Sequence, residues 1–359
     1  MAQTNRFFRF CIGIILILLV IFLGDKVKFI FNPLISLLSV ILVPAMLAGF
    51  FYYLLRPLVE LMHKRRVNRT LAIFLIYLVF GLIMAGFIIG IWPSLREQFL
   101  AFIENAPNLI KMLTEQVQEL EESGMLAQFL PEGSNILSRI TEVIDQGFTV
   151  LTDYMSGVVS FFSSFIMVLF VTPIILYFML KEGGKFGERI VGFMPKRFRD
   201  EGTALMDEID SSLSGFIVGR VIINVALGVL MYIGFLFIDL PYALLLTVIA
   251  VIMNFIPFIG AFLSSVPIVI IAFIQSPSMA IWALVIILAA QQIQDNLLAP
   301  YIFNKSLDIH PITTIVVVLV GGDIAGLMGV ILAIPFYMTL KIVITKVYHI
   351  FFKDKWEKA

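Results

Sequence analysis

The chain has 359 residues and no formal net charge; 60% of its residues are apolar and 14% are charged. Soluble domains are roughly half apolar and about a quarter charged, so lipid must solvate much of this chain. The zero net charge gives no indication of a nucleic-acid partner. Cys11 is the only cysteine, which excludes an intramolecular disulfide and a cysteine-based metal cluster. The composition therefore predicts an all-α, polytopic integral membrane protein.

Six apolar runs match a single membrane crossing, which takes about 20 helical residues for ~30 Å of hydrocarbon. They are Phe10–Gly24, Ile30–Leu55, Leu71–Trp92, Met155–Leu180, Val221–Ile238 and Met279–Phe303. The first run follows Arg6 and Arg9 as the core of a signal peptide would. It lacks a small-residue cleavage pattern, so we expect it to be retained as a span.

Two further runs, Tyr242–Gln275 and Pro311–Tyr348, are too long for one simple crossing. A helix of about 34 residues would extend ~51 Å, well beyond the hydrocarbon thickness. Each run is therefore predicted to break or to fold back. The chain then has about eight hydrophobic segments, of which two are interrupted or re-entrant.

Basic residues near the ends of spans predict the orientation of the chain. The loop between the second and third spans carries Glu60 and five basic residues: Arg56, Lys64, Arg65, Arg66 and Arg69. This loop is therefore predicted to be cytoplasmic, which places the N-terminus on the inner side of a bacterial inner membrane. The tail is also predicted to be inside because of its basic residues Lys346, Lys353, Lys355 and Lys358. Residues 93–153 then lie outside; they include ten Asp or Glu and three Lys or Arg. The helical spacing of their apolar residues predicts a few amphipathic helices.

These features divide the chain into six parts. They are a three-span scaffold (1–92), an acidic extracytoplasmic helical region (93–153), a fourth span (154–180), a cytoplasmic amphipathic region (181–213), a transport region with broken helices (214–348) and a cytoplasmic tail (349–359). Residues 181–213 are interpreted as an amphipathic helix lying at the inner interface. The alternative is a coupling element that moves with the transport region.

Polar and helix-breaking residues at membrane depth must be compensated there, so they indicate functional positions. The first group is Asn254, Pro257 and Gly260, inside an apolar run. Proline frees carbonyls of the preceding turn, and the neighbouring Asn and Gly favour the turn of a broken helix. A simple proline-kinked span, with Asn254 bonded to a neighbouring helix, is the alternative.

The second group lies at the end of an otherwise apolar helix. It consists of Gln291, Gln292, Gln294, Asp295 and Asn296, followed by Pro300. Gln291, Gln294 and Asp295 are spaced to share one helix face. They can line a watery cavity, in which Asp295 would bind a cation or a proton, or they can end the helix at the interface.

The third group is rich in glycine: Gly321, Gly322, Asp323, Gly326 and Gly329, with Pro335 beyond it. Glycines permit a sharp reversal, which would place Asp323 at the tip of a helical hairpin. Helix packing through Gly322 and Gly326 alone is the alternative. Arg220 and Asn224 begin a span, and Arg220 can pair with Asp295 or Asp323. For an arginine at a span end, extension to the interface is more common.

Motifs for ATP binding (G-x-x-x-x-G-K-[ST]), zinc peptidases (H-E-x-x-H) and serine hydrolases (G-x-S-x-G) do not occur in the sequence. We therefore expect no catalytic residues, no metal site and no cofactor. Two interrupted segments with polar groups at depth are typical of secondary transporters, whose binding sites form where helices break.

The polar and glycine-rich groups described above also resemble segments of a known transporter family. Segments Pro241–Leu246 and Asn254–Gly260, together with Gln294–Asn296, Pro300, Asn304–Lys305, His310–Pro311 and the glycine-rich stretch ending at Pro335, resemble the AI-2E (autoinducer-2 exporter-like, PerM-type) transporter family. Order and spacing agree over the second half, and the hydropathy outline agrees over nearly the whole chain. One departure is Gly219-Arg220, where Gly-Gln is expected; an arginine there would alter the preference for substrate charge.

The resemblance implies a multi-span permease that assembles as a homo-oligomer, and family members are linked to autoinducer-2 export or to Na⁺/H⁺ exchange. We expect an alternating-access exporter of a small polar solute, with a Na⁺/H⁺ antiporter as the first alternative. A membrane scaffold or regulator that binds a partner through its outer helices is the second. The predicted substrate or ion path consists of Asn254, Pro257, Gly260, Gln291, Gln294, Asp295, Asn296, Gly322, Asp323 and Arg220.

Overall fold

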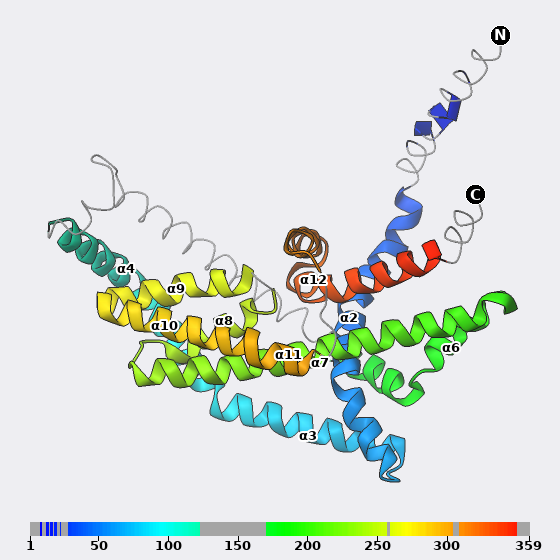
Figure 1. Ribbon diagram of the computed structural model, residues 1–359, viewed down its shortest axis with the longest axis horizontal. Coiled ribbons are helices and arrows are strands. Elements are labelled where there is room, and N and C mark those ends of the chain that lie inside the picture. Colours follow the sequence, from blue (N-terminus) through cyan, green and yellow to red (C-terminus); the bar gives the residue numbers. More distant parts are fainter. Residues whose placement is uncertain are drawn as a thin grey trace.

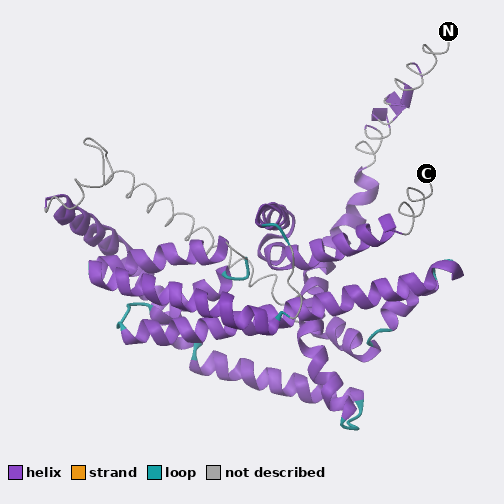
Figure 2. Cartoon of the chain, viewed as in Figure 1, coloured by secondary structure: helices purple, strands orange, loops and turns teal. Residues whose placement is uncertain are grey.

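The computed structural model describes residues 28–122, 170–256, 259–303 and 309–349, together with residues 8, 12–13, 15–16, 18–19 and 22. All regular elements within these ranges are helices (Figure 2). Five of them are long and apolar enough to cross a membrane, and three shorter apolar helices accompany them. The prediction of an all-α, polytopic membrane protein is confirmed. The predicted first span lies largely outside the described residues.

The chain forms two long helices before the first polar excursion. Helix α2 (Lys28–Lys64) is joined by a tight turn to α3 (Arg69–Gly90), as Figure 1 shows. The Asn68 side chain accepts a hydrogen bond from the Thr70 amide and so caps the first turn of α3. Most large apolar side chains of α3 are exposed, as expected for a helix that faces lipid.

The predicted outer region begins with one long helix, α4 (Trp92–Glu122). It continues through Pro107, and its buried residues Leu109 and Leu113 pack against the core of the second half of the chain. This agrees with the amphipathic pattern in the sequence. The remainder of the region, and residues 155–169 of the fourth predicted span, lie outside the described residues. The end of that span is helical from residue 170 to residue 182.

Residues 181–213, for which we expect an amphipathic helix at the inner interface, are divided among several helical elements. Helix α6 (Lys185–Gly192) and the short turn η2 (Lys196–Phe198) occupy only the first part of this segment. Helix α7 (Arg199–Phe237) then continues for 39 residues into the fifth span without a break. No proline follows Pro195 within this segment, and Asp200 and Glu201 stabilise the helix start through its dipole.

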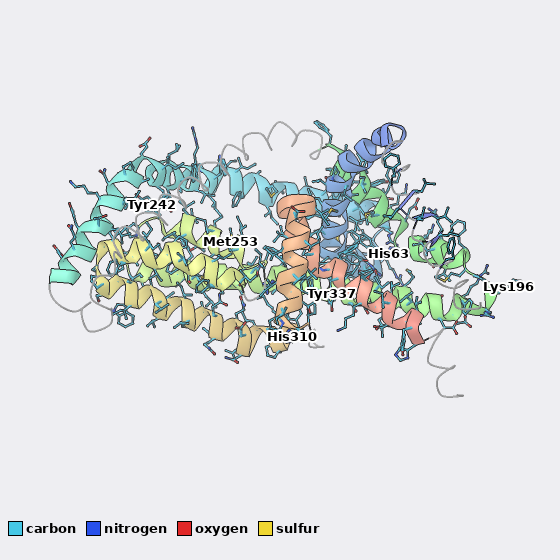
Figure 3. All side chains as sticks on the ribbon, turned by 90° about the horizontal axis from the view of Figure 1, so that it is seen from above. His63, Lys196, Tyr242, Met253, His310 and Tyr337 are labelled. Atoms are coloured by element: carbon cyan, nitrogen blue, oxygen red, sulfur yellow. The ribbon has the colours of Figure 1, made fainter. Side chains whose placement is uncertain are left out.

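The first overlong run is interrupted, as predicted. Helix α8 (Ala243–Met253) and helix α9 (Ile259–Gln275) run side by side and are joined at residues 254–258 (Figure 1). Tyr242 and Met253 mark the two ends of α8 in Figure 3. Gly260 lies against the chain before the turn, where an added Cβ would collide with the Met253 carbonyl. The turn therefore requires glycine at this position.

Helix α10 (Pro277–Ile293) completes the main core. Ser276 caps it by accepting a hydrogen bond from the Met279 amide, at 3.1 Å. Helix α10 continues through a π-helical turn, η3 (Gln294–Leu298), into α11 (Ala299–Ile302). Helices α4, α7, α8, α9 and α10 share one apolar core, which includes Leu227, Met231, Phe235, Leu246, Ile268 and Ala283.

The second overlong run, α12 (Pro311–Tyr348), is also interrupted as predicted. Ala325 and Gly326 leave the helical conformation, and Gly326 has φ +57°. The first half is seen almost end-on in Figure 1, whereas the second half runs across the picture. An added Cβ on Gly321 would lie 2.6 Å from the Gly329 carbonyl oxygen and 3.0 Å from the Ala333 Cβ. The two halves therefore form a V, and small residues allow its arms to touch.

Candidate functional site

The turn of the α8–α9 hairpin lies beside the middle of α7 and the end of α10. Asn254 is the residue at which these three elements meet, because its backbone amide closes α8 and its side chain contacts both other helices. The 11 residues of α8 and the 17 residues of α10 would span roughly 16 and 26 Å from their other ends. Both lengths are shorter than a hydrocarbon layer of ~30 Å.

Three buried amide side chains form a hydrogen-bonded network at this turn. The Asn254 Nδ2 donates to Asn224 Oδ1 at 2.9 Å and to Gln294 Oε1 at 2.8 Å. The exposed fractions are 3% for Asn254, 1% for Asn224 and 5% for Gln294. Buried amides are costly without partners, so these bonds fix the hairpin tip against α7 and α10.

The network extends along α10 toward its polar end. The Gln294 Nε2 lies 3.4 Å from Gln291 Oε1 and 3.2 Å from Asp295 Oδ1. Gln294 is buried and Gln291 half-buried, whereas Asp295 and Asn296 are exposed. Asn296 donates to Gln292 instead of joining the buried amides. The sequence-predicted group is therefore brought together only in part.

The π-helical turn η3 has a local cause. Pro300 carries no N–H, so it cannot donate to the Asn296 carbonyl four residues earlier. The helix widens by one residue, and the Ala299 amide bonds to the Gln294 carbonyl. Such turns are frequent at functional sites. This one coincides with the residue that connects α10 to the buried network.

Arg220 differs from the prediction that it extends to the interface. It is only 9% exposed, and its Nη2 donates to the backbone carbonyl of Asn254. It forms no salt bridge with any carboxylate of the described residues, although the charge of Asp295 acts on it at a distance. The rule for span ends failed because α7 continues for more than five turns before Arg220, which places this residue within the protein.

Two residues outside the predicted path belong to the same neighbourhood. Asn224 accepts from Asn254, and Thr247 on α8 is 5% exposed. The Thr247 methyl lies 3.9 Å from the position of a Cβ added to Gly228, one helical turn beyond Asn224. The spacing of Arg220 and Asn224 was a usable signal, since residues four apart share a helix face. A single threonine in an apolar helix carries no comparable signal.

Other predicted path residues are placed elsewhere. Asp323 is exposed on α12, and no hydrogen bond or ion pair in the described part of the chain joins it to the amide network. Gly322 packs beside Val330, whose Cγ2 lies 3.1 Å from an added Cβ. Gly260 shapes the hairpin turn. Pro257 lies outside the described residues.

Comparison with known proteins assigns the chain to a family. A model described as AI-2E family transporter matches residues 10–349. "Putative transport protein YueF" of Bacillus subtilis is 33% identical over 332 residues, covering 91% of this chain and 90% of the relative. "Putative transport protein YrrI" of the same organism is 28% identical, with 91% and 92% covered. A "Putative transport protein" of Haemophilus influenzae is 25% identical, with 86% and 87% covered. The chain is a member of the AI-2E transporter family.

Proposed function

We propose that this protein is a secondary transporter that exports a small polar solute, such as an autoinducer-2-like signalling molecule, by alternating access and without ATP hydrolysis. The observation that carries the proposal is the buried amide network of Asn254, Asn224 and Gln294 at the turn of a broken helix. Amides both donate and accept, so they suit the hydroxyl and carbonyl groups of a small polar solute.

The α8–α9 hairpin is proposed to act as the gate. Asn254 bonds its turn to Asn224 of α7 and to Gln294 at the end of α10, and Ile256 packs against a separate apolar cluster. The other end of the hairpin is packed into the main core through residues such as Leu246 and Ile268. A solute with matching polar groups replaces the Asn254 bonds at low cost. The hairpin turn then moves relative to α7 and opens the path on one side.

We propose that neighbouring helices hold the other end of the hairpin in place. Helix α4 packs along the hairpin, where Gln98 Oε1 accepts from the Leu245 amide at 3.1 Å and Phe102 meets Tyr242 at 5.5 Å between ring centres. We propose that this end is extracytoplasmic and that both termini are cytoplasmic in a bacterial inner membrane, with several copies assembling into a homo-oligomer. The division of the chain into six parts, with boundaries after residues 92, 153, 180, 213 and 348, also belongs to this proposal.

The proposal is tested by flux in vesicles. Purified protein is reconstituted and a panel of labelled polar metabolites and cations is followed against protein-free vesicles. We expect saturable movement of a polar metabolite, which Asn254→Ala abolishes. Asn108→Ala on the exposed surface of α4 is the matched control and keeps the flux. Equal rates in protein-containing and protein-free vesicles for the whole panel would refute transport of this class.

A Na⁺/H⁺ antiporter is the second candidate, favoured by the contact of Asp295 Oδ1 with the buried Gln294 amide. An antiporter needs a carboxylate that binds the cation and the proton in turn. The double variant Asp295→Asn, Asp323→Asn separates the two candidates. Absence of Na⁺-driven proton flux with the unaltered protein eliminates the antiporter, whereas flux that persists unchanged in this variant eliminates a role of the two carboxylates in it.

A further inference from the structure

Three buried polar atoms around the hairpin turn have no hydrogen-bond partner within the described residues. They are Arg220 Nε, Asn224 Nδ2 and Thr247 Oγ1. Two other atoms without partners, on Thr172 and Glu201, lie away from the network. A buried donor without a partner costs about 1–3 kcal/mol, so a cluster of such atoms indicates a ligand that the protein itself does not provide.

The positions of these atoms are related. Arg220 and Asn224 lie four residues apart on α7 and both contact Asn254, one through its backbone carbonyl and the other through its side chain. Thr247 faces Gly228, a further four residues along α7. The side chains that carry the three atoms therefore follow the interface between α7 and α8, beginning at the hairpin turn and leading along the hairpin.

The charge at this interface is not balanced locally. Arg220 is the one charged side chain that is buried among the described residues, and it has no salt bridge there. Arg56 provides the contrast, because it contacts both Glu60 and Asp210. A guanidinium removed from water without a carboxylate in contact is strongly unfavourable, so the site gains from any anion that reaches it.

We propose that Arg220 and Asn224 form the subsite for an anionic group, of the carboxylate class, on the small solute that this protein transports. The two unpaired groups, Arg220 Nε and Asn224 Nδ2, are donors, which matches an oxygen anion and excludes a cation at this point. Thr247 donates its hydroxyl to the remainder of the solute. This inference rests on the proposed transport function and specifies the charge of the substrate.

The charge of Asp295 is expected to oppose the binding of an anion at this subsite. Asp295 is exposed and accepts from Gln294, which is joined through Asn254 to Arg220, so the carboxylate lies near the guanidinium without contacting it. In the empty protein this carboxylate balances the arginine at a distance. When the solute arrives, the two negative charges compete for the same guanidinium. Removing the Asp295 charge should therefore tighten the binding of an anion.

The test uses the full chain in detergent micelles and acetate as the probe. Acetate affinity is measured from the rise in melting temperature with acetate concentration, at constant ionic strength. We expect Arg220→Gln to weaken acetate at least about tenfold, because a charge-assisted hydrogen bond is lost. Asp295→Asn is expected to strengthen acetate by about threefold or more. Arg56→Gln, which removes a paired arginine, should leave the affinity unchanged.

The outcomes separate this inference from transport itself. Unchanged acetate affinity in both Arg220→Gln and Asp295→Asn overturns the anion subsite, and it means that the unpaired donors hold water. If Arg220→Gln does not fold, Asp295→Asn alone decides, because its exposed side chain is not needed for the core. Solute flux without acetate binding overturns the subsite and leaves the transporter. Acetate binding without flux of any solute supports the subsite and contradicts the transporter.

Discussion

Asn254 at the turn of the α8–α9 hairpin donates a hydrogen bond to Gln294 in the π-helical turn after α10, at 2.8 Å. Both side chains are buried, and they are 40 residues apart in sequence. The two positions at which the helices of this region depart from regular geometry are thus joined directly. A movement of the hairpin turn and a change in the π-helical turn are therefore coupled.

This bond is expected to contribute measurably to stability. In a double-mutant cycle with Asn254→Ala and Gln294→Ala, we expect a coupling of about 1–2 kcal/mol, because Asn254→Ala leaves the buried Gln294 Oε1 without its donor. The free energy of unfolding in mixed micelles provides the measurement. Gln292→Ala, two residues away and exposed, is the control and should show no coupling to Asn254→Ala.

Gly260 is expected to tolerate no side chain. An added Cβ would collide with the Met253 carbonyl, which belongs to the backbone and cannot move aside, so Gly260→Ala must distort the turn. We predict a loss of about 1–3 kcal/mol of stability, measured as thermal unfolding in detergent. Gly49→Ala on α2 meets nothing within 4 Å and serves as the control. Equal stability of the two variants would show that the turn differs from the one described.

Arg56 is expected to join α2 to α7 electrostatically. It contacts Asp210 across the two helices and Glu60 within α2, at 2.6 Å. Because the side chains of Arg56 and Asp210 are 22% and 37% exposed, solvent screens the pair, and we expect a coupling of only about 0.5–1 kcal/mol. A double-mutant cycle with Arg56→Gln and Asp210→Asn measures it. The coupling should fall as salt is raised; a coupling that does not depend on salt would contradict an ionic origin.

The helices and their interruptions could be predicted because they follow from local sequence. Apolar runs fix the spans, and Pro or Gly at positions such as Gly260 and Gly326 fixes the breaks. The extent of α7 was wrong, because the polar residues before the span suggested a separate interfacial helix. Local charge composition cannot tell an interfacial helix from the projecting end of a longer one.

The site could be predicted only in part, because it depends on contacts between distant segments. Asn254 and Gln294 were each recognised as costly at membrane depth, yet no pattern in one sequence specifies that they meet. Arg220 was assigned to the interface by a rule that treats a helix in isolation. Its burial results from the hairpin turn packed against α7, which only the fold reveals. Asp323 was expected near the path, whereas the V of α12 leaves it exposed.

Solute is proposed to pass the amide network at the hairpin turn, and two glutamines at the end of α10 and in the turn that follows it test this proposal. Gln294 is buried and bonded to Asn254, whereas Gln292 is exposed two residues earlier. The initial rate of solute flux is measured in vesicles that contain equal amounts of folded Gln294→Ala or Gln292→Ala protein. The account predicts a loss of at least about tenfold for Gln294→Ala and a rate near that of the unaltered protein for Gln292→Ala. Equal rates for the two variants would contradict it.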